Sequence, residues 1–318
     1  MARPGGPQVL EVVETDLPPP LPHELRLRQT AVGVNYHDVY VRSGLYQTLP
    51  LPGVPGIEAV GVVEAVGSAV SAFAPGDRIG YVSGKYGGYA QARNLDADLA
   101  VKLPKGASDA QWAATLMKSF TAYMLLHRVR RTVAGETILV HAAAGGVGQL
   151  LCSWGRHLGL RVIGTVGSTE KAEIAHAYGA AEIILYREED VATRISELTG
   201  GQGVAAAYDA VGADTFMGSI ASLGFQGHLV NYGQASGPVE PFTPALLSTR
   251  SLTVTRPIVF HYLRTPAQLR AVADETFAAF ASGALRPIDP LELPFAEAAQ
   301  SHRLLEARQS PGGIVLIP

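Results

Sequence analysis

The first third of the chain alternates short apolar runs with turn signals, a pattern that predicts β-structure. Within residues 1–118 these runs are interrupted by four turn signals, Pro18-Pro19-Pro20, Pro50-Leu51-Pro52-Gly53, Pro75-Gly76-Asp77 and Gly87-Gly88. The stretch 56–67 is rich in Val and Gly, and glycines inside strands often mark bends or bulges. We therefore expect a curled, barrel-like sheet in this part of the chain.

The pattern changes near residue 119 to short buried strands that alternate with helical stretches. We expect a helix from the turn after residue 141 to about residue 158, and further helices at 171–178 and 191–198. Strands are expected at 137–141, 161–166, 181–185, 204–209, 228–232 and 251–255. Strands and helices in this order predict an α/β fold with a parallel, doubly wound sheet.

The last part of the chain predicts helices at 266–281 and 295–307 and a strand at 313–318, which we expect to return to the first domain. A chain of 318 residues corresponds to about two domains at roughly 150 residues each. The composition, 47% hydrophobic and 17% charged with 35 glycines, fits an α/β enzyme rather than a disordered or fibrous protein.

The formal net charge of −3 gives little attraction to phosphate backbones or anionic membranes, so no nucleic-acid or membrane partner is expected. No run of roughly 18 apolar residues is present, and residues 1–14 lack the apolar core of a signal peptide. Cys152 is the one cysteine, which excludes an intrachain disulfide and a cysteine-rich zinc site. The simplest compartment is a reducing cytoplasm.

A glycine-rich turn between a predicted strand and a predicted helix is the most informative motif. In His141-Ala-Ala-Ala-Gly-Gly-Val-Gly148, the residues Ala143, Gly145 and Gly148 occupy the three glycine positions of the G-x-G-x-x-G pattern. A small residue at each position permits a tight turn, the approach of a pyrophosphate and close packing of helix on strand. Since the helix N-terminus also favours negative charge, the motif predicts a dinucleotide site.

The cofactor preference is read about twenty residues further on. An NADH site would place Asp or Glu near Val166, at the end of the second strand, and no acid stands at that point of Val166-Gly-Ser-Thr-Glu-Lys171. Ser168 and Lys171 could instead bind a 2′-phosphate, because a lysine ammonium is a good point charge for phosphate. Ser168 could also cap the next helix, with Lys171 a solvated surface residue. We expect NADPH as the cofactor.

Many short segments along the chain are, taken together, typical of one protein family. They are Asn35-Tyr-His-Asp-Val-Tyr40, Arg42-Ser-Gly-Leu-Tyr46, Pro55-Gly-Ile-Glu58, Ala74-Pro-Gly-Asp-Arg78, Lys118-Ser-Phe-Thr-Ala-Tyr123, the glycine turn, Gly164-Thr-Val-Gly167, Tyr186-Arg-Glu-Glu-Asp190, Tyr208-Asp-Ala-Val-Gly212, Thr255-Arg-Pro257 and Leu316-Ile-Pro318. By these segments the chain resembles the quinone oxidoreductase (zeta-crystallin-like) group of the medium-chain dehydrogenase/reductase superfamily.

The resemblance implies a GroES-like β-rich catalytic domain, formed by residues 1–118 and 256–318, around a Rossmann NADPH-binding domain at 119–255. It also implies a homodimer, commonly formed by edge-strand pairing of the two Rossmann sheets.

The zinc positions of related alcohol dehydrogenases are altered in this chain. By resemblance Asn35 stands at the first ligand position, Ile57 replaces the His, and no Cys exists for the third. Without zinc no Lewis acid polarises an alcohol, so the expected acceptors are electron-poor conjugated systems such as quinones, enones and enals.

The resemblance also implies the site residues. Catalytic roles fall on Asn35, Tyr40 and Tyr46, with the tyrosines lining the acceptor pocket. Lys118 lies either near the lost zinc site or on the surface, and His37 and His141 are not expected to act as acids or bases. Residues expected to bind the cofactor are Asn35, Tyr40, Thr121, Ala144, Gly145, Gly146, Val147, Gly167, Ser168, Lys171, Tyr186, Val211, Tyr232, Gly233, Ser236, Pro257, Ile258, Val259 and Arg308.

Three functions stay open at this point. The first is an NADPH:quinone reductase without zinc. The second is an NADPH-dependent reductase of the double bond in enals, enones or enoyl thioesters, although no basic patch for coenzyme A can be identified. The third is a non-enzymatic RNA-binding or crystallin-like protein, against which the net charge and the cofactor motif argue.

Overall fold

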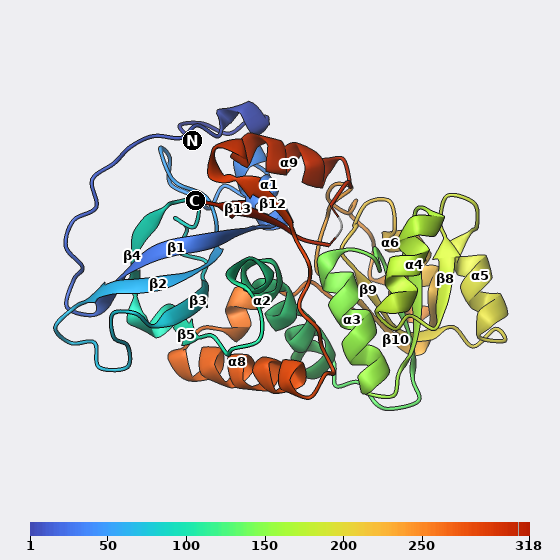
Figure 1. Cartoon of the computed structure of the whole chain (residues 1–318). Coiled ribbons are helices and arrows are strands. Elements are labelled where there is room, and N and C mark those ends of the chain that lie inside the picture. Colours follow the sequence, from blue (N-terminus) through green and yellow to red (C-terminus); the bar gives the residue numbers. More distant parts are fainter. Residues whose placement is uncertain (311) are drawn as a thin grey trace. The chain divides into compact units, whose positions relative to one another are not determined.

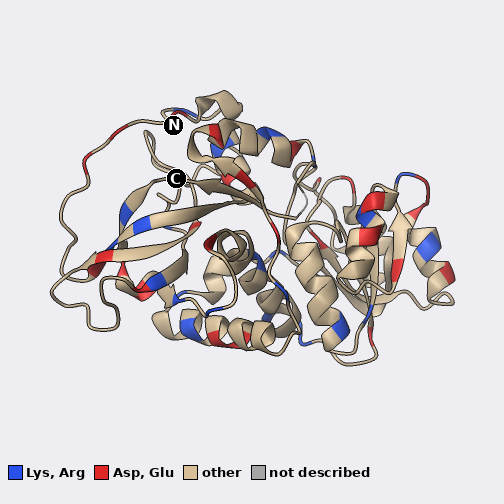
Figure 2. Cartoon of the chain, in the orientation of Figure 1, with Lys and Arg blue, Asp and Glu red and all other residues tan. Residues whose placement is uncertain are grey.

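The computed structural model describes residues 1–310 and 312–318 and divides into two compact units (Figure 1). The first unit comprises Met1–Lys118, Leu263–Phe277 and Pro287–Pro318. The second comprises Ser119–Tyr262 and Ala278–Arg286. Basic and acidic residues are interspersed along the ribbon of each unit (Figure 2). None of the helices in these ranges is long and apolar enough to cross a membrane.

The first unit is built on a seven-stranded sheet in the order β12-β13-β1-β2-β3-β5, with β4 also paired to β1. Its strands are β1 (Glu24–Val34), β2 (Glu58–Val66), β3 (Arg78–Val82), β4 (Ala92–Asp96), β5 (Ala100–Lys102), β12 (Leu291–Pro294) and β13 (Ile314–Ile317). Its helical elements are η1 (Pro7–Val9), α1 (Tyr36–Ser43), η2 (Ala97–Leu99), η5 (Phe295–Glu297) and α9 (Ala298–Glu306). Two longer helices, α2 (Asp109–Tyr123) and α8 (Pro266–Ala281), contain residues of both units.

The sheet of the first unit curls, as its turn-broken pattern predicts. β1 pairs with three strands, and its register with β2 shifts twice, between Arg26 and Leu27 and between Gln29 and Ala31. Such bulges increase the local bend and twist of a strand. At Gly61 the neighbouring backbone approaches so closely that an added Cβ would lie 2.2 Å from the Arg28 carbonyl oxygen. The glycines of the 56–67 stretch thus permit the bend.

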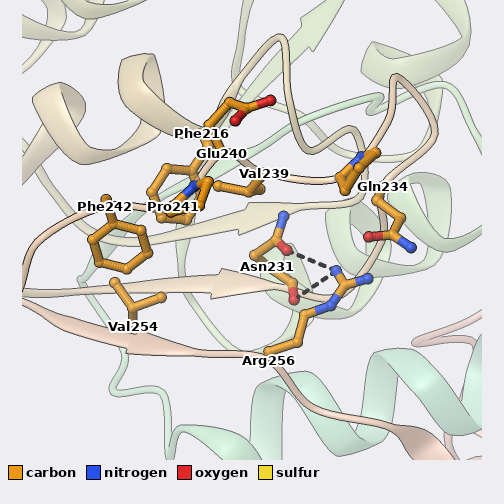
Figure 3. Close-up of a pocket in the computed structure, with 10 residues that line it drawn as sticks. Phe216, Asn231, Gln234, Val239, Glu240, Pro241, Phe242, Val254 and Arg256 are labelled. Carbon is orange, nitrogen blue, oxygen red and sulfur yellow. Dashed lines mark hydrogen bonds between the residues drawn. The ribbon is translucent and has the colours of Figure 1, made fainter.

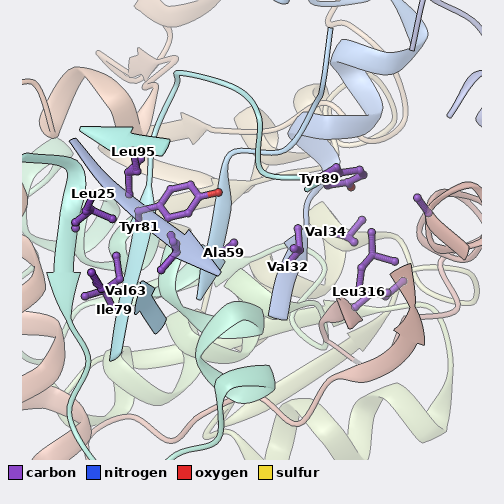
Figure 4. Packing of buried hydrophobic residues seen from close by; sticks show 14 residues of the cluster. Leu25, Val32, Val34, Ala59, Val63, Ile79, Tyr81, Tyr89, Leu95 and Leu316 are labelled. Atoms are coloured by element: carbon purple, nitrogen blue, oxygen red, sulfur yellow. The ribbon is translucent and has the colours of Figure 1, made fainter. Parts of the chain in front are cut away.

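Alternating side chains of β1 point into the core of this unit. Leu25 and Leu27 are fully buried, whereas Arg28, the next residue of β1, is exposed. The two leucines belong to one buried cluster with residues of the other strands, among them Ile79, Tyr81 and Leu316 (Figure 4). This core extends from the start of the chain to its last strand, so it joins segments that are far apart in sequence.

The second unit contains a six-stranded parallel sheet in the order β11-β10-β9-β6-β7-β8. Its strands are β6 (Thr137–Val140), β7 (Arg161–Val166), β8 (Glu182–Leu185), β9 (Val204–Asp209), β10 (Leu223–Asn231) and β11 (Thr253–Thr255). Its helical elements are η3 (Met124–Val129), α3 (Gly146–His157), α4 (Thr169–Ala177), α5 (Val191–Leu198), α6 (Phe216–Ser222), α7 (Ala245–Ser248) and η4 (Val259–Tyr262). This strand order is that of the doubly wound dinucleotide-binding fold, which confirms the predicted fold class.

The predicted and observed elements differ where the local pattern is weak. Helix α1 and the start of α2 lie within residues 1–118, for which mostly β-structure was predicted. Helix α2 is buried around most of its surface, so it lacks the apolar stripe that indicates an amphipathic helix. Strand β10 begins five residues before the predicted strand, and this added part is irregular, with Gln226 at φ 59° and a register shift against β9 between Leu223 and His228.

Candidate active site

The glycine turn connects β6 to α3 as predicted. An added Cβ at Gly148 would lie 2.3 Å from the Ala142 carbonyl oxygen, so only glycine permits this packing of helix against turn. Gly145 is the N-cap residue of α3, its N–H donates to the Ala142 carbonyl oxygen (2.8 Å), and no side chain caps the helix. The first-turn amides of α3 therefore lack intrahelical partners and suit an anionic pyrophosphate.

Neighbouring strands hold this turn in place. The Ala143 N–H donates to the Thr165 carbonyl oxygen on β7 (3.1 Å), and the His141 N–H donates to the Tyr208 carbonyl oxygen on β9 (3.0 Å). Both ring nitrogens of His141 also have partners, the hydroxyls of Thr165 and Ser219. Burial lowers the pKa of His141, so its ring is neutral and structural, as the sequence predicts.

The residues predicted to hold a 2′-phosphate gather after β7. Ser168 is the N-cap of α4, and its hydroxyl accepts from the Lys171 N–H, which places Lys171 in the first turn. An added Cβ at Gly167 would lie 2.7 Å from the Tyr186 hydroxyl oxygen, so Tyr186, after β8, covers Gly167. The structure thus brings four predicted cofactor residues together. The Arg187 guanidinium lies beside the same glycine, and the sequence analysis did not select it.

Asp209, the last residue of β9, organises the loop that carries Val211. Its Oδ1 accepts hydrogen bonds from the N–H groups of Val211 (2.7 Å) and Gly212 (3.1 Å) and from the Thr215 hydroxyl. The Ser236 hydroxyl donates to the Val211 carbonyl oxygen (2.8 Å), which joins the loops after β9 and β10. Two predicted cofactor residues, Val211 and Ser236, are therefore in direct contact at the carboxyl ends of these strands.

Arg256 holds the next pair of loops (Figure 3). Its Nη1 donates to the carbonyl oxygens of Asn231 (3.1 Å) and Gly233 (2.7 Å) and to Asn231 Oδ1 (2.7 Å). The guanidinium thereby fixes Tyr232 and Gly233 relative to Pro257, the residue that follows it. Beside it lies a pocket of about 470 Å³, lined by none of the predicted site residues but by Phe216, Asn231, Gln234, Pro238, Val239, Glu240, Pro241, Phe242, Val254 and Arg256.

An aromatic cluster in the first unit contains both predicted tyrosines. The rings of Tyr40 and Tyr46 lie 5.1 Å apart, and the His37 ring meets Tyr46 edge-on at 5.5 Å. The Nε2 atom of His37 lies 3.1 Å from the Tyr86 hydroxyl, and the two rings stack. Burial lowers the pKa of His37 to about 4, so the ring is uncharged near neutral pH. Flat, uncharged aromatic walls of this kind suit a planar conjugated ligand.

Asn35 lies between two buried charged groups. Its Nδ2 donates to Glu58 Oε2 (2.7 Å), and its Oδ1 accepts from Lys118 Nζ (3.2 Å). Glu58 Oε1 also accepts from the Met117 N–H (3.0 Å). Lys118 is therefore buried beside the former zinc position, and the interpretation of it as a surface lysine is wrong. Burial raises the pKa of Glu58 and lowers that of Lys118.

The same network continues through Asp38 towards α9. Asp38 Oδ2 accepts from the Asn35 N–H (2.8 Å) and from the Tyr89 hydroxyl (3.3 Å), which also lies 2.9 Å from His302 Nε2. Burial raises the pKa of Asp38 to about 7 and lowers that of His302 to about 3.

This donor set does not fit a zinc ion. The one oxygen that Asn35 could offer faces the Lys118 ammonium, and a second cation there would be repelled. Within residues 1–310 and 312–318, no three His, Cys, Asp or Glu side chains gather in a way that could hold a metal.

The remaining predicted residues lie at separate places. Thr121, on α2, and Val259 are buried, while Ile258 is 47% exposed. Arg308 follows α9 in the first unit, is exposed, and adopts φ 59°. Cys152 is fully buried on α3, where burial raises the pKa of its thiol to about 12 and so disfavours the reactive thiolate.

Comparison with known proteins agrees with this fold. Residues 146–276 match the family described as zinc-binding dehydrogenase, and residues 21–105 match the alcohol dehydrogenase GroES-like domain. A quinone oxidoreductase of Pseudomonas aeruginosa is 44% identical over 99% of this chain and 97% of its own. A 2-haloacrylate reductase of Burkholderia is 38% identical over 99% of this chain and 96% of its own. The crystal structure of Escherichia coli quinone oxidoreductase complexed with NADPH superposes with a TM-score of 0.94 at 39% identity, covering 100% of this chain and 98% of that one.

A GroES-like domain combined with a doubly wound sheet defines the medium-chain dehydrogenase/reductase superfamily, and the chain belongs to it. Within that superfamily it is a member of the quinone oxidoreductase group, as its resemblance predicts.

Several residues of the site were not selected from the sequence. Glu58 stands in a segment that was noted only as a family match, and Asp38 and Tyr86 carry no local signal of burial. Glu58 bonds Asn35 and the Met117 N–H, 23 and 59 residues away, and Tyr86 lies against His37, 49 residues away, so no spacing within one helix or strand reveals these two. Asp38 accepts from the Asn35 N–H at the start of α1, a local contact, but its second partner, Tyr89, is 51 residues away. Arg256 stands in the Thr255-Arg-Pro257 segment, which was noted as a family match. The single cation in that segment was the one signal that could have indicated a role for Arg256.

Proposed function

We propose that the chain is an NADPH-dependent quinone reductase that works without zinc. The observation that carries this proposal is the full-length likeness to quinone oxidoreductases, one of which is complexed with NADPH. The glycine turn supports it, because the α3 N-terminus and the close approach at Gly148 fit a pyrophosphate.

The cofactor is proposed to lie along the carboxyl ends of the parallel strands. Amides of the first turn of α3 would hold the pyrophosphate, and Lys171, Ser168 and Tyr186 would hold the 2′-phosphate. From the resemblance, Arg308 is proposed to bind the adenosine phosphates of the cofactor. Residues proposed for the pyrophosphate are Ala144, Gly145, Gly146 and Val147, and residues proposed for the nicotinamide half are Thr121, Val211, Tyr232, Gly233, Ser236, Pro257, Ile258 and Val259.

The acceptor is proposed to lie against the rings of Tyr40 and Tyr46, which line its pocket, with Asn35 donating a hydrogen bond to its oxygen. When bound, NADPH supplies a hydride. The residues of this chain would position the acceptor and keep water away from it, since no positioned metal polarises it.

A panel of quinones tests this proposal. Purified protein is given NADPH or NADH with each quinone, and cofactor oxidation is followed by absorbance. We expect turnover with quinones and a preference for NADPH. Oxidation of neither cofactor by any quinone would contradict the proposal.

The second candidate is reduction of a conjugated carbon–carbon double bond. The likeness to a 2-haloacrylate reductase favours it. Adding enals, enones and 2-haloacrylate to the same panel separates the two activities. The class of acceptor that is reduced with the higher kcat/KM identifies the preferred reaction.

We also propose a homodimer. Strand β11 stands at one end of the second unit's sheet, where a second copy of the chain could add its own β11 to form a homodimer. Sedimentation velocity would measure the mass directly.

We propose the cytoplasm as the compartment, because a single buried thiol needs no oxidising environment.

A further inference from the structure

The buried ammonium of Lys118 has capacity for a ligand. Lys118 is 8% exposed, and Nζ gives one hydrogen bond, to Asn35 Oδ1, among the described residues. An ammonium carries three N–H donors. Two donors of a charged group that is more than nine-tenths buried are therefore unmatched, and leaving such donors without a partner is costly.

Among the residues that the structure describes, no carboxylate bonds Lys118 Nζ directly. The buried carboxylate of Glu58 bonds Asn35 Nδ2 and the Met117 N–H, and the Asn35 amide stands between that carboxylate and the ammonium. The order Glu58–Asn35–Lys118 also fixes the orientation of the Asn35 side-chain amide. Its oxygen must face the Lys118 ammonium, and its nitrogen must face the Glu58 carboxylate. One hydrogen of Asn35 Nδ2 is left for a further acceptor.

We propose that Lys118 and Asn35 form a binding site for the acceptor oxygen and stabilise the negative charge that develops on it. This inference rests on the proposed reductase function and assigns the electrostatic role that zinc would otherwise supply. The acceptor gains a hydride, that is two electrons and one hydrogen nucleus, and NADP⁺ is left. Its oxygen then carries one negative charge, held by Lys118 Nζ and Asn35 Nδ2, until a proton from water completes the product.

The ligand class follows from the donors. A fixed cation beside a fixed amide N–H selects an oxygen that is negative or becomes negative, in the way of an oxyanion hole. The site would therefore bind a phenolate more tightly than the same ring without charge, and this preference can be measured without turnover.

The test compares Lys118→Met with Lys105→Met, a matched change at an exposed lysine of the same unit. For Lys118→Met we expect kcat for a quinone to fall by about 100-fold or more, as for loss of one oxyanion donor. The dissociation constant for NADPH, measured by fluorescence, should change by less than about twofold. Lys105→Met should match the wild type in both.

A binding experiment provides the second readout. The wild type should bind 2,4-dinitrophenolate, a flat anion, more tightly than 2,4-dinitroanisole, its neutral methyl ether. Lys118→Met should lose this preference, whereas Lys105→Met should keep it. Equal binding of the two ligands by the wild type would overturn the proposal.

A double variant separates the proposed role from simple charge balance. In Lys118→Met/Glu58→Gln both buried charges are removed, so the protein should fold even if Lys118→Met alone does not. If Lys118 only neutralises Glu58, the double variant regains wild-type kcat, and the proposal is wrong. We expect it instead to fold and stay inactive. A wild type that binds the phenolate but reduces no quinone would refute the function and leave the anion site intact.

Discussion

The guanidinium of Arg42, on α1, forms two hydrogen bonds with the carboxylate of Glu306, on α9, at 2.9 and 2.8 Å. The Arg42 side chain is 3% exposed and that of Glu306 is 38% exposed. This pair joins the helix that carries Tyr40 to the C-terminal helix of the first unit. It therefore couples the last part of the chain to the position of the candidate acceptor site.

Replacing Glu306 should destabilise the first unit. Glu306→Gln leaves a buried guanidinium without its carboxylate, and we expect a loss of about 2 kcal/mol, reduced from the fully buried case because Glu306 is partly exposed. Arg42 lowers the pKa of Glu306, so the pair stabilises the fold above the unfolded pKa, and this contribution is lost as pH falls through the folded pKa. Urea unfolding should show the variant and the wild type converging in acid, while Glu297→Gln, at an exposed glutamate, stays unchanged.

Asp38 should give the opposite pH dependence. Burial raises its pKa to about 7, well above the ordinary value of an aspartate, so the folded state binds the proton more tightly than the unfolded state. Its contribution is present below the unfolded pKa and is lost as pH rises towards the folded pKa. Asp38→Asn does not titrate, so its stability relative to the wild type should increase from about pH 4 to about pH 7. A difference that is constant over this window in urea unfolding would contradict the raised pKa.

Gly148 should tolerate no side chain. In Gly148→Ala the new Cβ meets the Ala142 carbonyl oxygen, so the turn and α3 must separate. We expect a loss of stability of about 2 kcal/mol and at least tenfold weaker NADPH binding, measured by calorimetry. The matched control is Gly218→Ala on α6, where a Cβ meets no atom within 4 Å. That change should be neutral or stabilising by about 0.5 kcal/mol.

Lys171 should determine the preference for NADPH. Lys171→Ala removes a cation from the first turn of α4, beside Ser168 and Gly167. We expect kcat/KM with NADPH to fall by about tenfold or more, while kcat/KM with NADH stays within about twofold, because NADH carries no 2′-phosphate. Parallel loss with both cofactors would point to a structural role instead.

Tyr40 and Tyr46 should affect turnover through their hydroxyls. Tyr40→Phe and Tyr46→Phe keep the ring pair and remove one polar group each. We expect kcat to fall by about tenfold, ~1.4 kcal/mol, for at least one of them. No change in kcat for either variant, measured at saturating quinone, would remove the tyrosines from the mechanism.

Much of the second unit could be predicted from the sequence because its signals are local. Strand β7 and helices α5 and α8 have the bounds that the periodicity predicts, and the glycine turn lies between a strand and a helix as expected. Helices α1 and α6 are short, with eight and seven residues, so they present barely two turns of pattern. The site predictions came from family resemblance, and their contacts with cofactor or acceptor stay predictions.

The class of fold, the glycine turn and the family could be read from the sequence alone, since each depends on neighbouring residues or short motifs. The burial of Lys118 against Asn35, and the place of Glu58 on the other side of that amide, became visible in the folded structure alone. The physical reason is that these groups are 23 and 83 residues from Asn35 along the chain, and only the packed core brings them together and removes water from around them. Whether an ammonium is a solvated surface group or a buried cation in need of a ligand is a property of that environment, not of the lysine.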